Sequence, residues 1–238
     1  MRLANKDAHG NDWDGWAAVE SAPLFTGVSP EDLRRISAVA RLKLFGRGEM
    51  LYLEGDKVEQ VVLLVSGLVK ITQLGPNGLE VILRLSAPGD VLDAASLFST
   101  GSHCATAQTI RRCGALVWDA GVFKAQVECV PVLHRNMIRF VGGHLQELEE
   151  RFRELATERV APRVAHQLVR LREQIGSAQN GEVEIGLSRE DLAQMTGCTL
   201  YTVSRLLSAW EAHGLVNPRR ESVVISDVQS LRKVFEEN

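Results

Sequence analysis

The hydrophobic pattern of the chain changes at about Asp119. From Arg41 to that point, short β-rich runs alternate with turn signals such as Ser66-Gly67 and Asn77-Gly78. The runs cover residues 61–65, 68–73, 81–85 and 115–118. Short strands at this spacing predict a small antiparallel sandwich or barrel. After Asp119 the apolar residues recur at helical spacing, so we expect the chain to continue as helix.

A short helix is expected before the strands. Ser29 is a good N-cap, Pro30 suits the first helical position, and Asp32 can close a variant capping box. The apolar face of this helix is expected to hold Leu33, Ile36 and Val39. Residues 1–21 show no such pattern, and we interpret them as an N-terminal tail.

The longest helical pattern begins at Pro131. After His134, apolar residues follow at alternating steps of four and three: Ile138, Val141, Leu145, Leu148, Phe152 and Leu155. This heptad spacing predicts a seam along which the helix pairs with a second copy of itself. The alternative interpretation is a helix that docks on the barrel. Gly142-Gly143 interrupts the pattern and either permits close approach to the barrel or marks a segment that changes state.

A domain boundary is expected near Ala161. Pro162 should end or kink the long helix, a second helix should cover residues 163–175, and residues 176–181 should form a polar loop. The remaining residues, 182–238, are too few to bury a core alone. They therefore need the preceding helix to form a domain.

The strongest signal lies between Leu187 and Trp210. Ser188 and Thr199 are N-caps of two successive helices. Counted from Arg189, the fifth, ninth and fifteenth positions are Ala193, Gly197 and Val203. Two steeply crossing helices need a small residue at their contact, a residue that tolerates positive φ in the turn, and a compact apolar residue on the second helix. The pattern therefore predicts a helix-turn-helix rather than an ordinary helical hairpin.

A β-hairpin is expected after the second of these helices. Residues 215–216 and 223–225 flank Asn217-Pro218-Arg219-Arg220, so the hairpin has a basic tip, as a wing does. Asp227 can cap a final helix. The residues expected to face double-stranded DNA are Ser188, Arg189, Thr199, Tyr201, Thr202, Ser204, Arg205, Arg219 and Arg220. Arg205 is the candidate for a bidentate contact to guanine, or for a phosphate contact.

Composition limits these interpretations. The chain of 238 residues has a formal net charge of -3, so it lacks the broad basic footprint of many nucleic-acid-binding proteins. Specific contacts must therefore carry any DNA binding. The four cysteines show no metal-ligand spacing, and we predict neither a disulfide framework nor a metal site. No secretory signal and no membrane-spanning run is evident, so a cytoplasmic protein without membrane contact is expected.

The order of barrel, long pairing helix and winged helix-turn-helix resembles the cyclic-AMP receptor and fumarate-nitrate regulator superfamily of bacterial transcription regulators. The resemblance rests on Pro23-Leu24-Phe25 with the helix after it, on Ala87-Pro88-Gly89-Asp90, and on residues 187–215. It implies an α+β fold with an antiparallel, cyclic-nucleotide-binding-like β-roll, a homodimer, and contact with RNA polymerase at promoters. The implied domains are a tail (1–21), a β-roll sensor (22–130), a dimerisation helix (131–160) and a DNA-binding domain (161–238).

The sequence departs from this family at the nucleotide pocket. The family's Glu and its Arg-Ser pair align with Ala94, Cys104 and Ala105, and hydroxyl residues of its long helix align with Leu148 and Glu149. Cyclic AMP is therefore not expected as a ligand, and no cofactor is predicted. The candidate sensor pocket consists of Ala94, His103, Cys104, Ala105 and Leu148. A haem-based or thiol-based sensor of the same fold remains an alternative.

Two other functions fit the sequence less well. A cyclic-nucleotide-binding module that does not bind DNA would not need the winged helix. A cupin-like metal enzyme needs several histidine and carboxylate ligands inside the barrel, and His103 is the one histidine in that region of the sequence. We therefore predict a regulator without catalytic residues.

Overall fold

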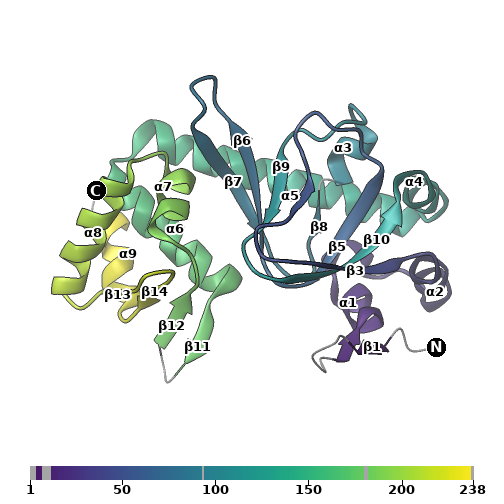
Figure 1. Ribbon diagram of the computed structural model, residues 1–238, viewed down its shortest axis with the longest axis horizontal. Helices are drawn as coiled ribbons and strands as arrows, with labels where there is room; N and C mark the ends of the chain where they lie inside the picture. The colour runs from purple at the N-terminus through teal and green to yellow at the C-terminus, as the bar shows by residue number, and fades with distance from the viewer. Residues whose placement is uncertain (1–3, 7–11, 93, 180–181, 237–238) are drawn as a thin grey trace. The chain divides into compact units, whose positions relative to one another are not determined.

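The computed structural model describes residues 4–6, 12–92, 94–179 and 182–236, with side chains from residue 17 onward (Figure 1). The chain forms two compact units. The first comprises Met1–Gln73 and Leu83–Gln146, and the second comprises Leu74–Ile82 and Glu147–Asn238. Within the described ranges, every helix is too short or too polar to cross a lipid bilayer.

The predicted β-roll is confirmed as two four-stranded sheets. Their strand orders are β3-β10-β5-β8 and β4-β9-β6-β7, and neighbouring strands with a described register run antiparallel. The strands are β3 (Arg41–Phe45), β4 (Met50–Tyr52), β5 (Gln60–Ser66), β6 (Val69–Leu74), β7 (Glu80–Ser86), β8 (Val91–Leu92), β9 (Thr106–Thr109) and β10 (Cys113–Asp119).

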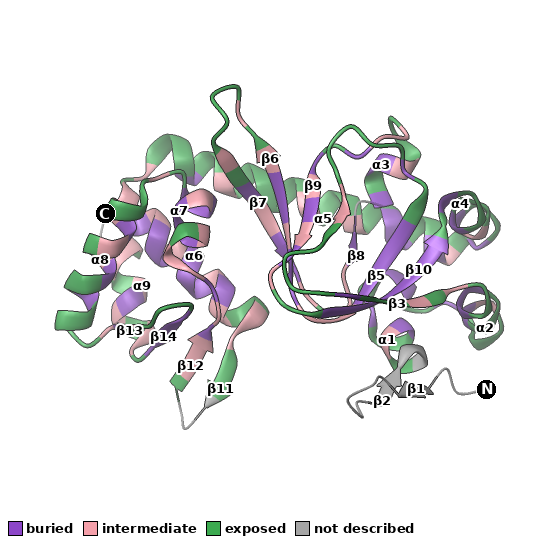
Figure 2. Cartoon of the chain, viewed as in Figure 1, coloured by how far each residue is buried: buried purple, intermediate pink, exposed green. Residues whose placement is uncertain are grey.

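The sheet of β5 and β10 is buried on both faces (Figure 2). Because side chains alternate along a strand, β5 sends Val62 and Leu64 into the interior of the roll and Val61 and Leu63 to its outside. This explains why β5 reads as a continuous apolar run rather than as an alternating one.

Helices cover the outer face. They are α1 (Gly15–Ser21), the 3-10 helix η1 (Pro23–Phe25), α2 (Pro30–Ala38), α4 (Ala120–Cys129) and the start of α5 (Pro131–Thr157). Trp118 of β10 donates from Nε1 to the carbonyl of Ile36 at 2.8 Å. Asn136 of α5 donates from Nδ2 to the carbonyls of Leu24 and Thr26. These buried bonds tie the helices to the sheet. A short helix, α3 (Ala94–Phe98), follows β8.

The second unit contains the winged helix-turn-helix. Its helices are α6 (Val160–Ile175), α7 (Arg189–Thr196), α8 (Leu200–Ala212) and α9 (Val228–Glu236), together with residues 147–157 of α5. A sheet of order β11-β12-β14-β13 lies beside them, with β11 (Ser177–Gln179), β12 (Glu182–Ile185), β13 (Val216–Pro218) and β14 (Val223–Ile225).

Four local expectations were wrong. The expected tail contains helix α1, whose Val19 is fully buried. Val39 is 47% exposed because α2 ends at Ala38. Pro162 lies in the first turn of α6, where its missing N–H is tolerated, and α5 already ends at Thr157. The expected polar loop contains β11, which pairs with β12.

The expected N-terminal tail also contains two short strands. A two-stranded pairing joins β1 (Ala4–Lys6) to β2 (Asp12–Asp14). Residues 1–3 and 7–11 of the expected tail lie outside the described residues.

Candidate DNA-binding surface and sensor pocket

The helix-turn-helix is built as its capping residues predict. Ser188 Oγ accepts from the Asp191 N–H at 3.0 Å, and the Asp191 carboxylate accepts from the Ser188 N–H at 3.0 Å, which completes a capping box. Thr199 Oγ1 accepts from the Thr202 N–H at 3.1 Å and starts α8. The two helices therefore begin at fixed residues.

The turn depends on Gly197. Its φ of 63° is left-handed, and a Cβ there would lie 3.1 Å from Leu155 Cδ1. Both conditions favour glycine. Val203 of α8 is fully buried and Ala193 of α7 is 5% exposed, as the spacing predicted, and the two helices pack against each other.

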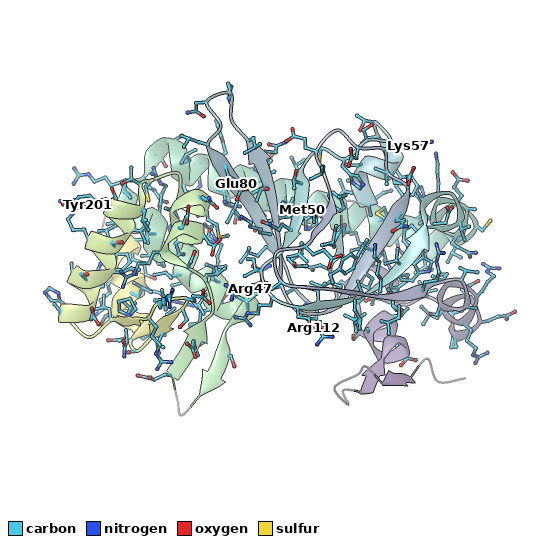
Figure 3. The ribbon with its side chains drawn as sticks, viewed as in Figure 1. Arg47, Met50, Lys57, Glu80, Arg112 and Tyr201 are labelled. Carbon is cyan, nitrogen blue, oxygen red and sulfur yellow. The ribbon has the colours of Figure 1, made fainter. Side chains whose placement is uncertain are left out.

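The other face of α8 is open to solvent. Tyr201 is 76% exposed and lies at the start of the helix, where Figure 3 labels it. Thr199 and Arg205 are exposed, and Thr202 and Ser204 are partly buried. The face combines an aromatic ring, three hydroxyls and a guanidinium. Such a face can donate and accept hydrogen bonds at base edges and phosphates.

The wing places its two arginines differently. Arg219 donates to the Glu184 carboxylate at 3.2 Å, and Ser222 also donates to Glu184. Arg220 is exposed at the tip, between the paired strands β13 and β14. Before α7, Ser188 and Arg189 are partly buried, and the Ser188 hydroxyl is occupied by the cap. The sequence could not show that Glu184, 35 residues before Arg219, would be its partner.

The heptad seam of α5 is exposed in the single chain. Its six residues, Ile138, Val141, Leu145, Leu148, Phe152 and Leu155, have exposed fractions from 38% to 72%. Leu133 and Met137, by contrast, are buried against the β-roll core. One face of the helix therefore docks on the roll, while the seam remains without a cover within the described chain.

The candidate sensor residues lie in different surroundings. Ala94 and Ala105 are buried, and Cys104 is exposed with its sulfur 3.6 Å from Ser96 Oγ. His103 is buried and stacks on Tyr52, with the ring centroids 3.8 Å apart. Leu148 belongs to the second unit and is part of the exposed seam. Ala94, Cys104 and Ala105 supply no cation, so the anion clamp is missing from the aligned positions.

A cavity of about 380 Å³ opens beside His103 in the first unit. Its polar lining residues are Tyr52, Asp56, Lys57, Glu59, Gln60 and His103, and Lys57 is labelled in Figure 3. The volume suits a small organic molecule. Sequence reasoning missed this cavity because its residues come from β3, β4, β5 and two loops with no shared spacing.

Two further groups were not identified from the sequence. Arg151 of α5 donates to the carbonyl of Met195 at 2.9 Å and to that of Ile82 at 3.2 Å. A cation at the last turn of α7 is favourable because helix C-termini carry partial negative charge. On α5, burial and, secondarily, the charge of Arg84 lower the pKa of His144 to about 4.

Two domain families match the chain. The Crp-like helix-turn-helix domain matches residues 162–234, and the cyclic nucleotide-binding domain matches residues 42–128. A CRP-like cAMP-activated global transcriptional regulator of Mycobacterium tuberculosis is 27% identical over 89% of this chain and 96% of its own length. A nitrogen fixation regulation protein, FixK, of Azorhizobium caulinodans is 26% identical over 87% of this chain and 86% of its own.

Solved structures agree with these matches. FixK2 from Bradyrhizobium japonicum has a TM-score of 0.74 at 25% identity, and the match covers 82% of this chain and 97% of that chain. The CooA mutant from Carboxydothermus hydrogenoformans has a TM-score of 0.71 at 22% identity, covering 90% of this chain and 95% of that chain. Both share the fold that is described above.

Proposed function

The chain belongs to the cyclic-AMP receptor and fumarate-nitrate regulator (CRP/FNR) family of transcription regulators, and from that membership we propose that it binds a specific promoter sequence as a homodimer. One observation carries the proposal. The exposed face of α8 follows a capped helix-turn-helix and holds Tyr201 and Arg205 at the surface.

The contacts divide by their chemistry. We assign Arg205 and Tyr201 on α8 to base edges, whereas the hydroxyls of Thr199 and Thr202 and the guanidinium of Arg220 suit phosphates. Arg219 is the weaker candidate, because its ion pair with Glu184 must be broken or shared before it can bind a phosphate. The net charge of -3 makes these local contacts more important than the general field.

The exposed seam of α5 supports the homodimer. A row of six large apolar side chains in water is unfavourable, and a second copy of the same helix would cover it. Two copies of α8 would then read two half-sites of an inverted repeat.

Selection from a random duplex library tests this proposal. We expect the full chain to enrich an inverted repeat whose half-site centres are about 34–36 Å apart, one turn of the double helix. Enrichment of a single half-site would contradict dimeric binding. If no sequence is enriched but the protein still binds random duplex in a salt-dependent way, it binds DNA without sequence specificity.

The remaining roles follow from family membership alone. We propose contact with RNA polymerase at promoters, a cytoplasmic location where the DNA lies, and action through binding rather than catalysis.

We propose that any signal that controls DNA binding acts at the β-roll. A Soret band in freshly purified protein would identify a haem sensor. For a thiol sensor, Cys113 is a poor candidate because burial raises the pKa of its thiol.

A further inference from the structure

Three potential metal ligands meet where α5 ends and α6 begins. Glu154 is in the last turn of α5, Glu158 follows one turn later along the chain, and His166 is on α6. One ligand atom from each lies within 4.8 Å of the other two. Among the residues that the structure describes, this is the one group of three or more histidine, cysteine or carboxylate side chains whose ligand atoms lie so close together.

Two of the three separations are close to the distances between ligands of a small divalent cation. His166 Nδ1 lies 3.0 Å from a Glu158 carboxylate oxygen and 3.9 Å from Glu154 Oε1. Zinc binds histidine nitrogen and carboxylate oxygen at about 2.0–2.2 Å. Two ligands of a tetrahedral ion at that bond length are roughly 3.3–3.6 Å apart. The observed separations lie on either side of this range, so small side-chain movements would complete the site.

The surroundings hold the ligands in place. Arg170 binds both oxygens of Glu154 at 2.7 Å, and Gln167 accepts a further bond from Arg170 at 3.3 Å. The ring of Phe235 packs on that of His166, with centroids 3.7 Å apart. Carboxylate ligands of metals are commonly oriented by such outer hydrogen bonds. Each carboxylate oxygen keeps a lone pair for a metal ion after it accepts one bond.

The charges leave room for a cation. Glu154 and Glu158 supply two carboxylates to the cluster, and Arg170 pairs with Glu154. Arg153 lies 3.8 Å from Glu158 and is itself 62% exposed, so it can turn toward solvent. The side chains of Glu158 and His166 are 18% and 24% exposed, which gives an ion access from water.

We propose that Glu154, Glu158 and His166 form a binding site for a divalent transition-metal cation, with zinc as the ion tested. Water would complete its coordination. The imidazole and two carboxylates are ligands that zinc accepts. A bound ion would clamp the end of α5 to α6, the first helix of the DNA-binding domain, across the two residues that separate them.

Calorimetric titration of the metal-free full chain with Zn²⁺ tests the site. We expect one ion per chain. Glu158→Gln and His166→Gln should each bind Zn²⁺ about tenfold or more weakly, because loss of even an outer hydrogen-bond partner of a metal ligand lowers metal affinity by about 10–100-fold. Glu158→Gln is nearly isosteric and partly exposed, so its fold should be kept. Glu150→Gln on the exposed face of α5 and His213→Gln at the end of α8 are the matched controls, and both should bind Zn²⁺ as the parent does.

Cobalt substitution identifies the ligands independently. Co²⁺ in a site of nitrogen and oxygen ligands should give visible d–d bands without the thiolate charge-transfer band that the cysteines would produce. A thiolate band would overturn the proposal, because the ion would then be at a cysteine. Equal Zn²⁺ binding by the parent and Glu158→Gln, or no binding by the parent, would also overturn it and leave a hydrogen-bonded cluster that holds no metal ion. Neither measurement uses DNA, so failure here leaves the proposed function untouched.

Discussion

Arg205 and Tyr201 are the side chains on which sequence discrimination should depend. Arg205 is exposed on α8, where its planar fork of donors can match the two acceptors of guanine in the major groove. Tyr201 carries a phenol, which can both donate and accept a hydrogen bond at a base edge. We therefore expect the selected operator to depend on Tyr201 as well as on Arg205.

Replacing Arg205 by alanine tests its role. We expect Arg205→Ala to lose about 1–3 kcal/mol of discrimination between the selected site and random duplex, if the contact is bidentate to guanine. Arg220→Ala in the wing is the comparison, and it should weaken all sequences alike and flatten the salt dependence. Fluorescence anisotropy over a salt series measures both. An equal loss on specific and random duplex would make Arg205 a phosphate contact.

Cyclic AMP should not bind at the β-roll. A buried cyclic phosphate is a permanent anion that needs donors and a counter-charge. Ala94 and Ala105 are buried and offer neither, and Cys104 stands where an arginine is expected. Arg111 and Arg112, which follow β9, are both exposed.

Calorimetric titration with cyclic AMP and cyclic GMP measures this directly. The cAMP-activated regulator of Mycobacterium tuberculosis provides a positive control at 27% identity. We expect heat of binding from that control and none from this chain. Micromolar binding here would show that other residues hold the phosphate.

His144 should make the fold sensitive to mild acid. Its pKa in the folded chain is about 4, below its ordinary 6.5, because of burial and of Arg84. Between these values the unfolded chain takes up a proton first, so this contribution to stability is complete above pH 6.5 and is lost as the pH falls toward 4. Urea unfolding across this range should show a shallower pH dependence in His144→Gln than in the parent. His213→Gln, at an exposed position, should retain the parental slope, and identical profiles for all three would exclude His144 as the cause.

The elements of the helix-turn-helix depend on their caps. Ser188 and Asp191 satisfy each other's backbone N–H groups at the start of α7, and Arg151 donates to the carbonyl of Met195 in its last turn. A helix of this length has little stability of its own, so its ends must be fixed by such contacts.

Ser188→Ala should therefore destabilise the second unit by about 1 kcal/mol, with a range of roughly 0.5–2. Ser208→Ala, at an exposed position inside α8, is the matched control and should be neutral or slightly stabilising, since alanine favours helix interiors. Denaturant unfolding of the full chain, followed by helical circular dichroism, measures both. Equal stability of the two variants would show that the capping box is dispensable.

Elements with local signals could be predicted from the sequence. The caps at Ser29, Ser188 and Thr199 and the left-handed Gly197 depend on neighbours within a few residues, and each has the predicted conformation. Strand β11 was missed because Ser177–Gln179 has a polar sequence and becomes a strand only by pairing with β12. Helix α1 was missed because its burial depends on Val19 meeting a core that forms elsewhere in the chain.

The candidate sites divide in the same way. The face of α8 follows from one helix and its period, so its exposed residues could be predicted. The cavity beside His103 and the cluster of Glu154, Glu158 and His166 each combine different elements. Their chemistry arises from tertiary packing, which no spacing in the sequence encodes.

Helix α5 has two faces with different surroundings. Leu133, Asn136 and Met137 attach its first half to the β-roll, and the six seam residues remain exposed along its length. In the proposed homodimer, α5 would contact the second copy and would also join the β-roll to the DNA-binding domain of its own chain. Dimerisation should therefore be required for specific DNA binding, because each copy supplies one recognition helix.

Leu148→Lys tests that requirement. The ammonium would be buried without a partner in the paired seam, which is strongly unfavourable. We expect this variant to have the monomer mass of 26.2 kDa by light scattering, whereas the parent should have twice that mass. Glu150→Lys introduces the same side chain at an exposed position two residues away, outside the seam, and should remain dimeric. The monomer should still fold, since Leu148 is 52% exposed in the single chain, but it should lose binding to the inverted repeat. A Leu148→Lys protein with unchanged mass would show that the chain pairs through another surface, or that it does not pair at all.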